Sequence, residues 1–325
     1  MADVTRRRML TAGAIGAAGL AAAVTGKTQA NTQQPVAPKA GEANQRNKLG
    51  RLNGQVALFT GAARGIGRAI AIALAKEGAD VALVDIASQI PSVEYPMATP
   101  ENLAETLRLV QAEGSRAVSI KADVRRGDQM KSAAERAIKE LGKIDILIPN
   151  AGICTYVASL DRMSEAEWDD VIAVNLTGVA RTMQAVIPHM RQRKQGRIIV
   201  VNSTNSRFGS PGSPSYNASK WGVLGLVKCA ATEVAKDNIT VNAINPTGVR
   251  TMMTQNDAAR RWANPANPTQ ENLEKALMEF NPLPISFLQP EQVANSLLFF
   301  AMPEAAHITG EAMDVAAGAN VRWNS

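Results

Sequence analysis

The stretch Thr60-Gly61-Ala62-Ala63-Arg64-Gly65-Ile66-Gly67 decides the fold predicted for this chain. It follows a short apolar run and opens an amphipathic helix, which is the context that a dinucleotide-binding glycine loop requires. Gly61 permits a tight turn, Gly65 lets the backbone approach a pyrophosphate, and Gly67 allows the helix to pack closely. Because a helix N-terminus attracts phosphate, we expect this strand, loop and helix to form a nucleotide-binding unit.

From residue 55 onward, short apolar runs alternate with longer helical patterns, which is typical of repeated β-α units around a parallel sheet. The expected fold class is therefore α/β, a Rossmann-type doubly wound sheet of about seven strands with helices on both faces, in one domain over 51–325. The strands are predicted over 56–60, 81–85, 117–121, 144–148, 197–202, 239–244 and 312–315. The clearest amphipathic helices are predicted over 66–77, 128–141, 165–191 and 215–235.

The composition fits one large α/β core and argues against several other classes. Of the 325 residues, 46% are hydrophobic and only 4% are aromatic, so Ala, Val, Ile and Leu must fill the core. The formal charge of +6 is not arranged as a basic stripe with interleaved aromatic residues, so no nucleic-acid partner is expected. Cys154 and Cys229 lack a CxxC spacing, and His189 and His307 stand alone, so neither a metal site nor a disulfide framework is predicted.

The N-terminal segment has the features of an export signal. Thr5-Arg6-Arg7-Arg8 precedes an apolar run over 11–26 that is shorter than the roughly 20 residues of a membrane-spanning helix. Residues 1–30 are therefore predicted to be a bacterial twin-arginine signal, followed by a linker over 31–50. This interpretation predicts export to the periplasm in the folded state, without stable membrane insertion. The alternative is a basic tail on a cytoplasmic protein.

Asp85 bears on which nucleotide the loop binds. It ends the second predicted strand, where a carboxylate can accept hydrogen bonds from the adenosine ribose hydroxyls and repels a 2′-phosphate. NAD is therefore favoured over NADP as the cofactor. Arg64 is the opposing feature because its guanidinium could reach such a phosphate, although an arginine at a helix start can equally be solvated.

Tyr216 and Lys220 are four residues apart at the start of a predicted helix, so their side chains lie on one face. A neighbouring ammonium favours the phenolate and moves the tyrosine pKa towards the range useful for acid-base chemistry. One such pair carries little information, because ordinary surface residues often have the same spacing. Ser203 adds weight, since it ends a buried strand 13 residues earlier and its hydroxyl could bond a substrate oxygen.

Together these motifs resemble the short-chain dehydrogenase/reductase family from about residue 52 to the C-terminus. The motifs that occur in the order of that family are the glycine loop, Asp123-Val124, Asn150-Ala151-Gly152, Asn175, Ser203, Tyr216, Lys220 and Asn245-Pro246. The resemblance implies that Asn175 anchors a proton-relay water and that Lys220 binds the nicotinamide ribose. The implied catalytic residues are Asn175, Ser203, Tyr216 and Lys220. The implied cofactor-binding residues are Gly61, Arg64, Gly65, Ile66, Gly67, Asp85, Ile86, Asp123, Val124, Asn150, Ala151, Gly152, Tyr216, Lys220, Pro246, Thr247, Gly248, Val249 and Thr251.

Some of these positions have a structural alternative. Asp123 and Asn150 could mainly tie strands together instead of contacting the cofactor. Pro149 departs from the family, which usually has Asn at that position, so the turn on the cofactor side is expected to differ slightly.

Two long connections extend the resemblance to one branch of the family. The stretch Tyr95-Pro96-Met97-Ala98-Thr99-Pro100-Glu101 and the stretch Asn245-Pro246-Thr247-Gly248-Val249-Arg250-Thr251-Met252 are similar to the mycofactocin-associated branch typified by carveol dehydrogenases. Ile66 and Asn245 depart from that branch. The resemblance implies NAD that is held almost without exchange, with the first insertion covering it.

The expected function is hydride transfer between NAD(H) and a secondary alcohol or ketone. The alternatives are an NADP-dependent 3-ketoacyl-type reductase, which Asp85 opposes, and a non-catalytic NAD-binding sensor, which the complete Ser203, Tyr216 and Lys220 set opposes. A serine hydrolase would need a G-x-S-x-G elbow, and the chain has none. Trapped NADH would need a second substrate or an external redox partner for reoxidation.

The segment 251–290 is predicted to form a lid. Its apolar residues favour a mainly apolar substrate, although they could equally pack the lid on the core. They are Met252, Met253, Trp262, Leu273, Leu277, Phe280 and Leu283. The family resemblance also implies a homotetramer formed through the helices over 165–191 and 215–235.

Overall fold

The computed structural model describes residues 50–157 and 159–323. The predicted signal peptide, 1–30, and all of the predicted linker except Gly50 lie outside the described residues. The fold and the site described below therefore concern the predicted catalytic domain.

Seven parallel strands form one sheet in the order β3-β2-β1-β4-β5-β6-β7, which confirms the predicted doubly wound fold. The strands are β1 Val56–Thr60, β2 Asp80–Asp85, β3 Ala117–Lys121, β4 Ile146–Ile148, β5 Gly196–Val201, β6 Ile239–Pro246 and β7 Ala312–Val315. The strand order reverses between β1 and β4. In open α/β sheets, ligands bind in the crevice at the carboxyl ends of the strands at such a point.

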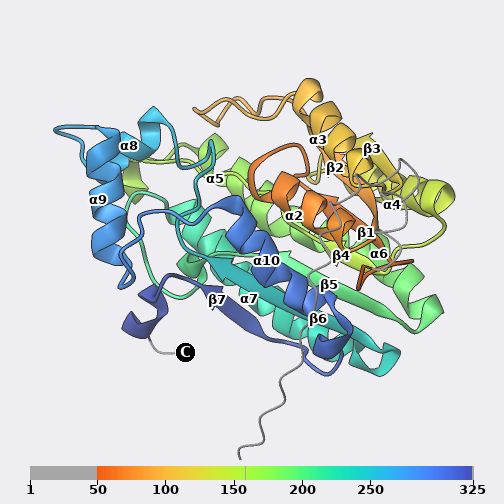
Figure 1. The fold of residues 1–325 in the computed structure, drawn as a ribbon. Helices are drawn as coiled ribbons and strands as arrows, with labels where there is room; N and C mark the ends of the chain where they lie inside the picture. Colours follow the sequence, from red (N-terminus) through yellow and green to blue (C-terminus); the bar gives the residue numbers. More distant parts are fainter. Residues whose placement is uncertain (1–49, 158, 324–325) are drawn as a thin grey trace, which may run out of the picture. The chain divides into compact units, whose positions relative to one another are not determined.

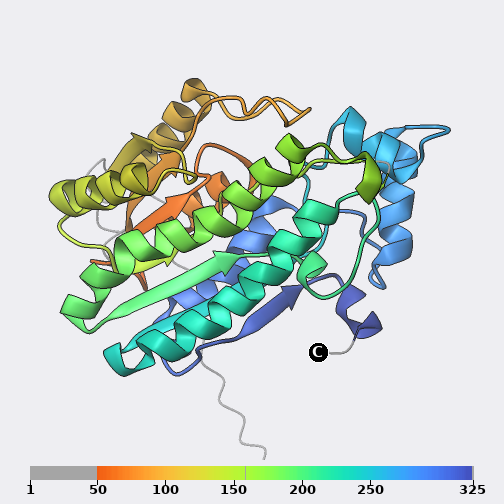
Figure 2. The same ribbon diagram turned by 180° about the vertical axis from the view of Figure 1, so that it is seen from behind.

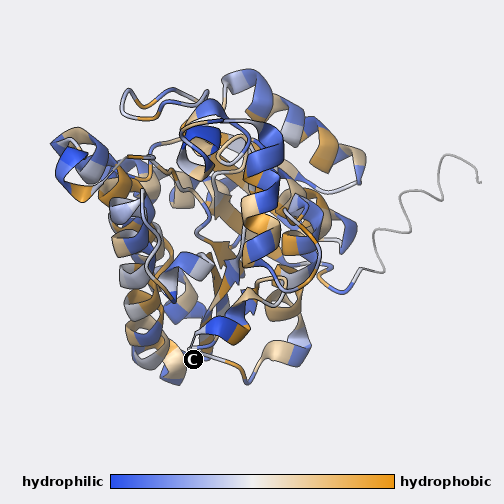
Figure 3. Cartoon of the chain, turned by 90° about the vertical axis from the view of Figure 1, so that its left-hand side faces the viewer, coloured by the Kyte–Doolittle hydropathy of each residue, from blue (hydrophilic) through white to orange (hydrophobic). Residues whose placement is uncertain are grey.

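Helices cover both faces of the sheet, as Figure 1 and Figure 2 show from opposite sides. One face carries α2 (Gly65–Lys76), α3 (Pro100–Ala112) and α10 (Pro290–Ala301). The other face carries α4 (Gly127–Leu141), α6 (Gly178–Arg193) and α7 (Pro214–Val234). Figure 3 shows mostly hydrophobic strands between helices whose outward sides are largely hydrophilic.

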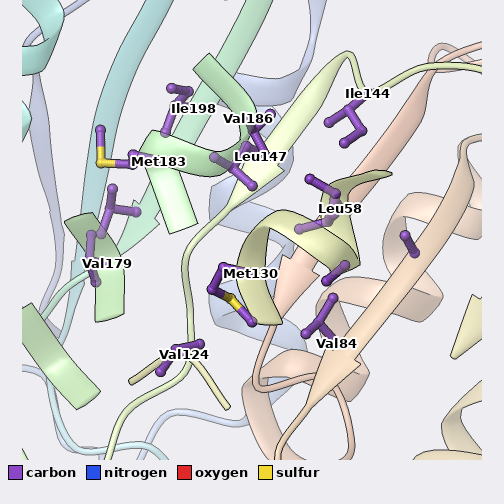
Figure 4. Packing of buried hydrophobic residues seen from close by; sticks show 14 of the residues in the cluster. Leu58, Val84, Val124, Met130, Ile144, Leu147, Val179, Met183, Val186 and Ile198 are labelled. Atoms are coloured by element: carbon purple, nitrogen blue, oxygen red, sulfur yellow. The ribbon is translucent and has the colours of Figure 1, made fainter. Parts of the chain in front are cut away.

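The sheet separates two hydrophobic clusters, because successive residues of a strand point to opposite faces. In the cluster beneath α4 and α6, Met130 and Val186 of these helices meet Leu58 of β1 and Leu147 of β4 (Figure 4). Burial of each such side chain stabilises the fold by roughly 1.5–3 kcal/mol. This packing fixes the strands whose carboxyl ends form the site.

The helix predicted over 165–191 is divided into three parts, which the sequence pattern did not indicate. They are α5 (Glu165–Ile172), the π-helical segment η3 (Ala173–Thr177) and α6. Asn175 lies fully buried in the π-helical segment, and such segments are frequent at functional sites. By length and hydropathy the whole run Glu165–Arg193 could cross a membrane, yet its apolar side packs in the cluster below the sheet.

The two long connections lie at the carboxyl edge of the sheet. The first leads from β2 into α3, a helix that the sequence analysis did not predict and that begins after Thr99, whose side chain accepts a hydrogen bond from Asn102 N. The second contains α8 (Asp257–Ala263) and α9 (Gln270–Phe280). In Figure 1 the loop before α3 extends toward α8. There Glu94 Oε2 and Arg261 Nη2 form an ion pair of 2.9 Å, so the two connections contact each other.

Candidate active site

The glycine loop between β1 and α2 has the geometry of a phosphate cradle. Gly61 and Gly65 have φ angles of +71° and +56°, a region that favours glycine. A Cβ at Gly67 would lie 1.9 Å from the Gly61 carbonyl oxygen, and a Cβ at Gly61 would lie 2.8 Å from Asn150 Nδ2. The loop can therefore adopt this turn, and bring the helix N-terminus close, only with glycine at Gly61 and Gly67.

Asp85 is buried at the end of β2 and joins two loops. Its two carboxylate oxygens accept hydrogen bonds from Ala63 N and Ala87 N, each at 2.9 Å. A carboxylate accepts up to four such bonds, so capacity for ribose hydroxyls is left. Arg64 donates to the carbonyl oxygen of Pro96 in the first insertion. In this structure its guanidinium thus holds the insertion against the glycine loop.

Asp123 and Asn150 both have structural partners. Asp123 pairs with Arg125 through an ion pair of 2.8 Å and accepts a hydrogen bond from Arg125 N. Asn150 Nδ2 donates to the carbonyl oxygens of Thr60 and Gly61 at 2.9 and 3.1 Å, which ties β4 to β1. Both residues also line the cavity described below, so the structural alternative and a cofactor contact are compatible.

Asn175 holds the loop that follows β4. Its Oδ1 accepts from Ile153 N at 2.8 Å, and its Nδ2 donates to the Ile153 carbonyl oxygen at 2.8 Å and to Ser219 Oγ at 3.2 Å. Both amide hydrogens are thereby used. The side chain thus positions the loop that forms one wall of the site.

Tyr216 and Lys220 lie on one face of α7, as the spacing predicts, opposite the end of β5. Lys220 Nζ donates to the Val201 carbonyl oxygen at 3.2 Å and lies 5.5 Å from the centre of the Tyr216 ring. Burial lowers the pKa of Lys220 to about 8.

The environment of Tyr216 departs from the expectation drawn from the spacing. Burial raises the pKa of Tyr216 above its ordinary value, and the neighbouring Ser203 side chain opposes this shift only in part. Desolvation therefore has the largest effect on the Tyr216 hydroxyl. The contact with Ser203 does bring together two of the four residues predicted to be catalytic.

Two cavities meet beside Tyr216. The first, of about 410 Å³, extends from the glycine loop along the carboxyl ends of β2, β3 and β4. The second, of about 480 Å³, lies between Ser203 and the lid helices α8 and α9. The residues that line both cavities are Ile66, Asn202, Tyr216, Thr251 and Met253. This junction is the place where a nucleotide in the first cavity could meet a molecule in the second.

Most residues predicted to bind the cofactor line the first cavity, with four exceptions. Those that line it are Gly61, Arg64, Gly65, Ile66, Gly67, Asp85, Ile86, Asp123, Val124, Asn150, Ala151, Gly152, Tyr216, Lys220 and Thr251. Pro246, Thr247, Gly248 and Val249 line the second cavity instead. Strand β6 continues to Pro246, and the residues after it lead to Thr251, which lines both cavities. The glycine cradle, the Asp85 carboxylate and this lining fit a dinucleotide.

The structure adds residues that the sequence analysis did not assign to the site. Ile90, Tyr95, Met97 and Ala98 of the first insertion line the first cavity. In the second cavity the additional residues include Cys154, Tyr156, Asn205 and Phe208. The composition held a signal for two of these residues, because tyrosine is rare in this chain. There are only three tyrosines, and each of them lines at least one of the two cavities.

The apolar residues predicted in the lid do not all line the same cavity. Trp262, Leu273, Leu277 and Phe280 line the second cavity, and Met253 lines both. Met252 lines the first cavity. Leu283 lines neither cavity and its side chain is 56% exposed, so its inclusion among the candidate substrate contacts finds no support in the structure.

Comparison with known proteins agrees with this geometry. A family model described as short chain dehydrogenase matches residues 55–262. A (-)-trans-carveol dehydrogenase of Rhodococcus erythropolis is 39% identical over 277 residues, covering 84% of this chain and 100% of that protein. A 3-oxoacyl-[acyl-carrier-protein] reductase of Staphylococcus epidermidis is 37% identical over 262 residues, covering 81% of this chain and 97% of that protein.

Solved structures give the same result. The crystal structure of carveol dehydrogenase from Mycobacterium avium in complex with NAD is similar with a TM-score of 0.82 and 37% identity, covering 84% of this chain and 99% of that one. The similarity therefore extends over both cavities and both insertions rather than over the nucleotide-binding half alone. This chain belongs to the short-chain dehydrogenase/reductase family.

Proposed function

We propose that this protein is an NAD-dependent oxidoreductase that transfers hydride between NAD(H) and a neutral, mainly apolar secondary alcohol or its ketone. The observation that supports this most directly is the position of Tyr216 at the junction of the two cavities, in contact with Ser203 and with Lys220 behind it. NAD, when bound, would supply the carbon that accepts or donates the hydride.

The chain itself would orient the substrate and move the proton. The hydroxyls of Ser203 and Tyr216 would bond the substrate oxygen, and Tyr216 would take its proton during oxidation or return it during reduction. The Lys220 ammonium would stabilise the phenolate, because it lies behind the tyrosine ring. Lys220 also lines the first cavity, where it would bind the nicotinamide ribose. Asn175 would position the Ile153 loop and so the floor of the junction. A relay water would complete the path of the proton to solvent.

The lining of the second cavity supports an uncharged substrate. Among the described residues, none that lines this cavity is an Asp, Glu, Lys or Arg. Its lining includes the aromatic side chains Phe208, Trp262 and Phe280 beside aliphatic residues. Burial of an apolar molecule there would supply most of the binding free energy, and the two hydroxyls would fix its orientation.

An NADP-dependent 3-ketoacyl-type reductase is the second candidate, because a reductase of that kind is 37% identical. Asp85 argues against it, since its buried carboxylate would face the 2′-phosphate. A non-catalytic NAD sensor is the third candidate, and it would bind nucleotide without turning over any alcohol. Both alternatives are tested by the experiment below.

Tight retention of NAD is part of the proposal. The first insertion is held over the cofactor cavity by contacts with three separate elements. They are the Arg64 to Pro96 hydrogen bond, the Ser92 Oγ to Asp170 Oδ2 hydrogen bond of 2.7 Å, and the Glu94 to Arg261 ion pair. Release of a bound dinucleotide would require several of these contacts to break together. NADH formed in the site would then be reoxidised in place by a second substrate or an external redox partner.

Export by the twin-arginine route and a periplasmic location remain part of the proposal and rest on the sequence. A folded protein that carries its own NAD would suit a compartment with little free nucleotide. A homotetramer is also proposed, and the partly exposed Trp168 of α5 and Trp221 of α7, at 38% and 52% exposure, would be covered in its interface.

The deciding experiment is native mass spectrometry of the purified full chain after extensive dialysis, followed by a screen of secondary alcohols without added nucleotide. We expect one NAD per chain and turnover of apolar alcohols with an artificial electron acceptor. NADP in the site, or turnover of 3-ketoacyl thioesters only, would favour the reductase. Bound NAD without turnover of any alcohol or ketone would favour the sensor.

A further inference from the structure

The three tyrosines of the chain come together around one short segment. The hydroxyl oxygen of Tyr95 accepts a hydrogen bond from Cys154 N at 3.2 Å. Tyr156 and Tyr216 both line the second cavity together with Cys154. Tyr216 is assigned to proton transfer, and Tyr156 donates to the Met253 carbonyl oxygen in the lid segment. Tyr95 is the member of this group that still lacks a role.

Tyr95 is held in a fixed position within the first insertion. The Gln89 amide organises the loop around it, since Nε2 donates to the Val93 carbonyl oxygen at 2.8 Å and Oε1 accepts from Met97 N at 2.9 Å. The Tyr95 side chain is only 5% exposed and belongs to the hydrophobic cluster below the sheet. Tyr95 is therefore a buried residue of a structured loop, and it lines the first cavity.

The Tyr95 hydroxyl has a hydrogen to donate. It acts as acceptor toward Cys154, and within residues 50–157 and 159–323 this is its one hydrogen-bond partner. Burial raises the pKa of Tyr95, so the hydroxyl keeps its proton at neutral pH. A buried donor without an acceptor is unfavourable, which favours a ligand atom at this place. Tyr95 lines the first cavity, which is the one proposed to hold the dinucleotide.

The surroundings of Tyr95 indicate which part of the dinucleotide it faces. The next residue, Pro96, accepts a hydrogen bond from Arg64 of the glycine loop, and Cys154, which donates to the Tyr95 hydroxyl, lines the second cavity together with Tyr216. The glycine loop is the expected place of the pyrophosphate, and Tyr216 marks the nicotinamide end. Tyr95 therefore lies beside the middle of the cavity, where a dinucleotide presents the oxygens of its pyrophosphate and of its nicotinamide ribose.

We propose that Tyr95 is a direct ligand of the bound dinucleotide, whose hydroxyl donates a hydrogen bond to an oxygen of the pyrophosphate or the adjoining nicotinamide ribose. This inference rests on the proposed binding of NAD in the first cavity. It gives the insertion a polar contact with the cofactor in addition to covering it. The competing explanation is that the hydroxyl only tethers the insertion to Cys154.

The test compares Tyr95→Phe with Tyr156→Phe in the full chain. Both variants lose one buried tyrosine hydroxyl near Cys154, but Tyr156 lines only the second cavity. Release of bound NAD is measured on the holoenzyme after dilution into excess labelled NAD. Equilibrium binding of ADP-ribose and of AMP is then measured after charcoal treatment. ADP-ribose retains the pyrophosphate and the distal ribose, whereas AMP lacks both.

For Tyr95→Phe we expect release of NAD and the Kd of ADP-ribose to rise by about tenfold, with the Kd of AMP unchanged. Tyr156→Phe should leave all three values unchanged. Equal weakening of AMP and ADP-ribose would show that the insertion had only loosened, and unchanged values would show that the hydroxyl contacts no ligand. Either result overturns the inference. Wild-type protein that binds no NAD would instead overturn the proposed function.

Discussion

Lys220 Nζ lies 5.5 Å from the centre of the Tyr216 ring and donates its hydrogen bond to the Val201 carbonyl oxygen. The ammonium thus lies behind the tyrosine and is anchored to the end of β5, two residues before Ser203. A helix and a strand are thereby fixed to each other at the point where the two cavities meet. The predictions below concern this arrangement and the loops that support it.

Tyr216→Phe removes the hydroxyl and retains the ring. We expect kcat for alcohol oxidation to fall by about a hundredfold or more, because none of the other described residues that line both cavities carries an acidic or basic side chain. Retention of NAD should be unchanged, since the lost group acts on the proton. Steady-state kinetics with a nucleotide assay on the same sample check both statements. Oxidation at nearly the wild-type rate would refute the assigned role.

Lys220→Met tests the cost of the buried ammonium through the pH dependence of stability. The pKa of Lys220 is lowered from 10.5 to about 8, so between these pH values the unfolded chain binds more protons than the folded chain. This contribution destabilises the nucleotide-free fold fully below pH 8 and disappears as the pH rises toward 10.5. It amounts to at most about 3 kcal/mol.

The variant lacks this contribution. The unfolding free energy of Lys220→Met minus that of wild type should therefore be larger at pH 7.5 than at pH 9.5. Urea unfolding of nucleotide-free protein measures this difference. Groups that titrate in both proteins, including the buried tyrosines, contribute equally to the two unfolding free energies. Their contributions therefore cancel in the difference. A difference in unfolding free energy that does not change with pH would mean that Lys220 titrates normally.

Asp85→Ser should weaken binding of NAD and admit NADP, because the negative charge that opposes a 2′-phosphate is gone. The structure adds a second effect. The carboxylate accepts from Ala63 N and Ala87 N, so the shorter serine leaves at least one buried donor unsatisfied and costs about 1–3 kcal/mol of stability. Asp85→Asn is the matched control, since it removes the charge and keeps the size. If the serine variant still discriminates fully against NADP in binding assays, another residue sets cofactor choice.

Asn175→Ala should destabilise the loop that follows β4, because Ile153 loses the partners of both its backbone N–H and its carbonyl oxygen. We expect a loss of about 2 kcal/mol or more in unfolding free energy, together with lower kcat. Asn175→Asp can still accept from Ile153 N, but it places a buried carboxylate oxygen against the Ile153 carbonyl oxygen and should be at least as destabilised as the alanine variant. Wild-type stability with low kcat would assign Asn175 a purely catalytic role.

The overall fold could be predicted from the sequence because its signals are local. Alternation of apolar runs and amphipathic helices reflects the two periodicities of strand and helix, and each strand predicted in this way has a counterpart in the sheet. The glycine loop was readable for the same reason, since Gly61, Gly65 and Gly67 meet steric requirements within eight residues of chain. The joint order of Ser203, Tyr216 and Lys220 pointed to one family, which the comparisons confirm.

Local signals were insufficient where a residue has its partner far along the chain. Nothing near Asn175 in the sequence indicates a π-helical segment, because that segment accompanies hydrogen bonds to Ile153, 22 residues away. Likewise, the sequence did not indicate that Pro246 to Val249, which are predicted to bind the cofactor, line the second cavity. The pKa of Tyr216 also depends on burial, which the spacing to Lys220 does not report.

The sequence by itself determined the class of fold, the nucleotide loop and the set of residues available for proton transfer. Only the tertiary structure decided that Tyr95 reaches Cys154 across 59 residues and that Glu94 reaches Arg261 across 167. The physical reason is that periodicity and steric demand act between neighbours in the chain. Contacts between two insertions depend instead on where the sheet places the carboxyl ends of β2, β4 and β6, and that is fixed only when the whole core has packed.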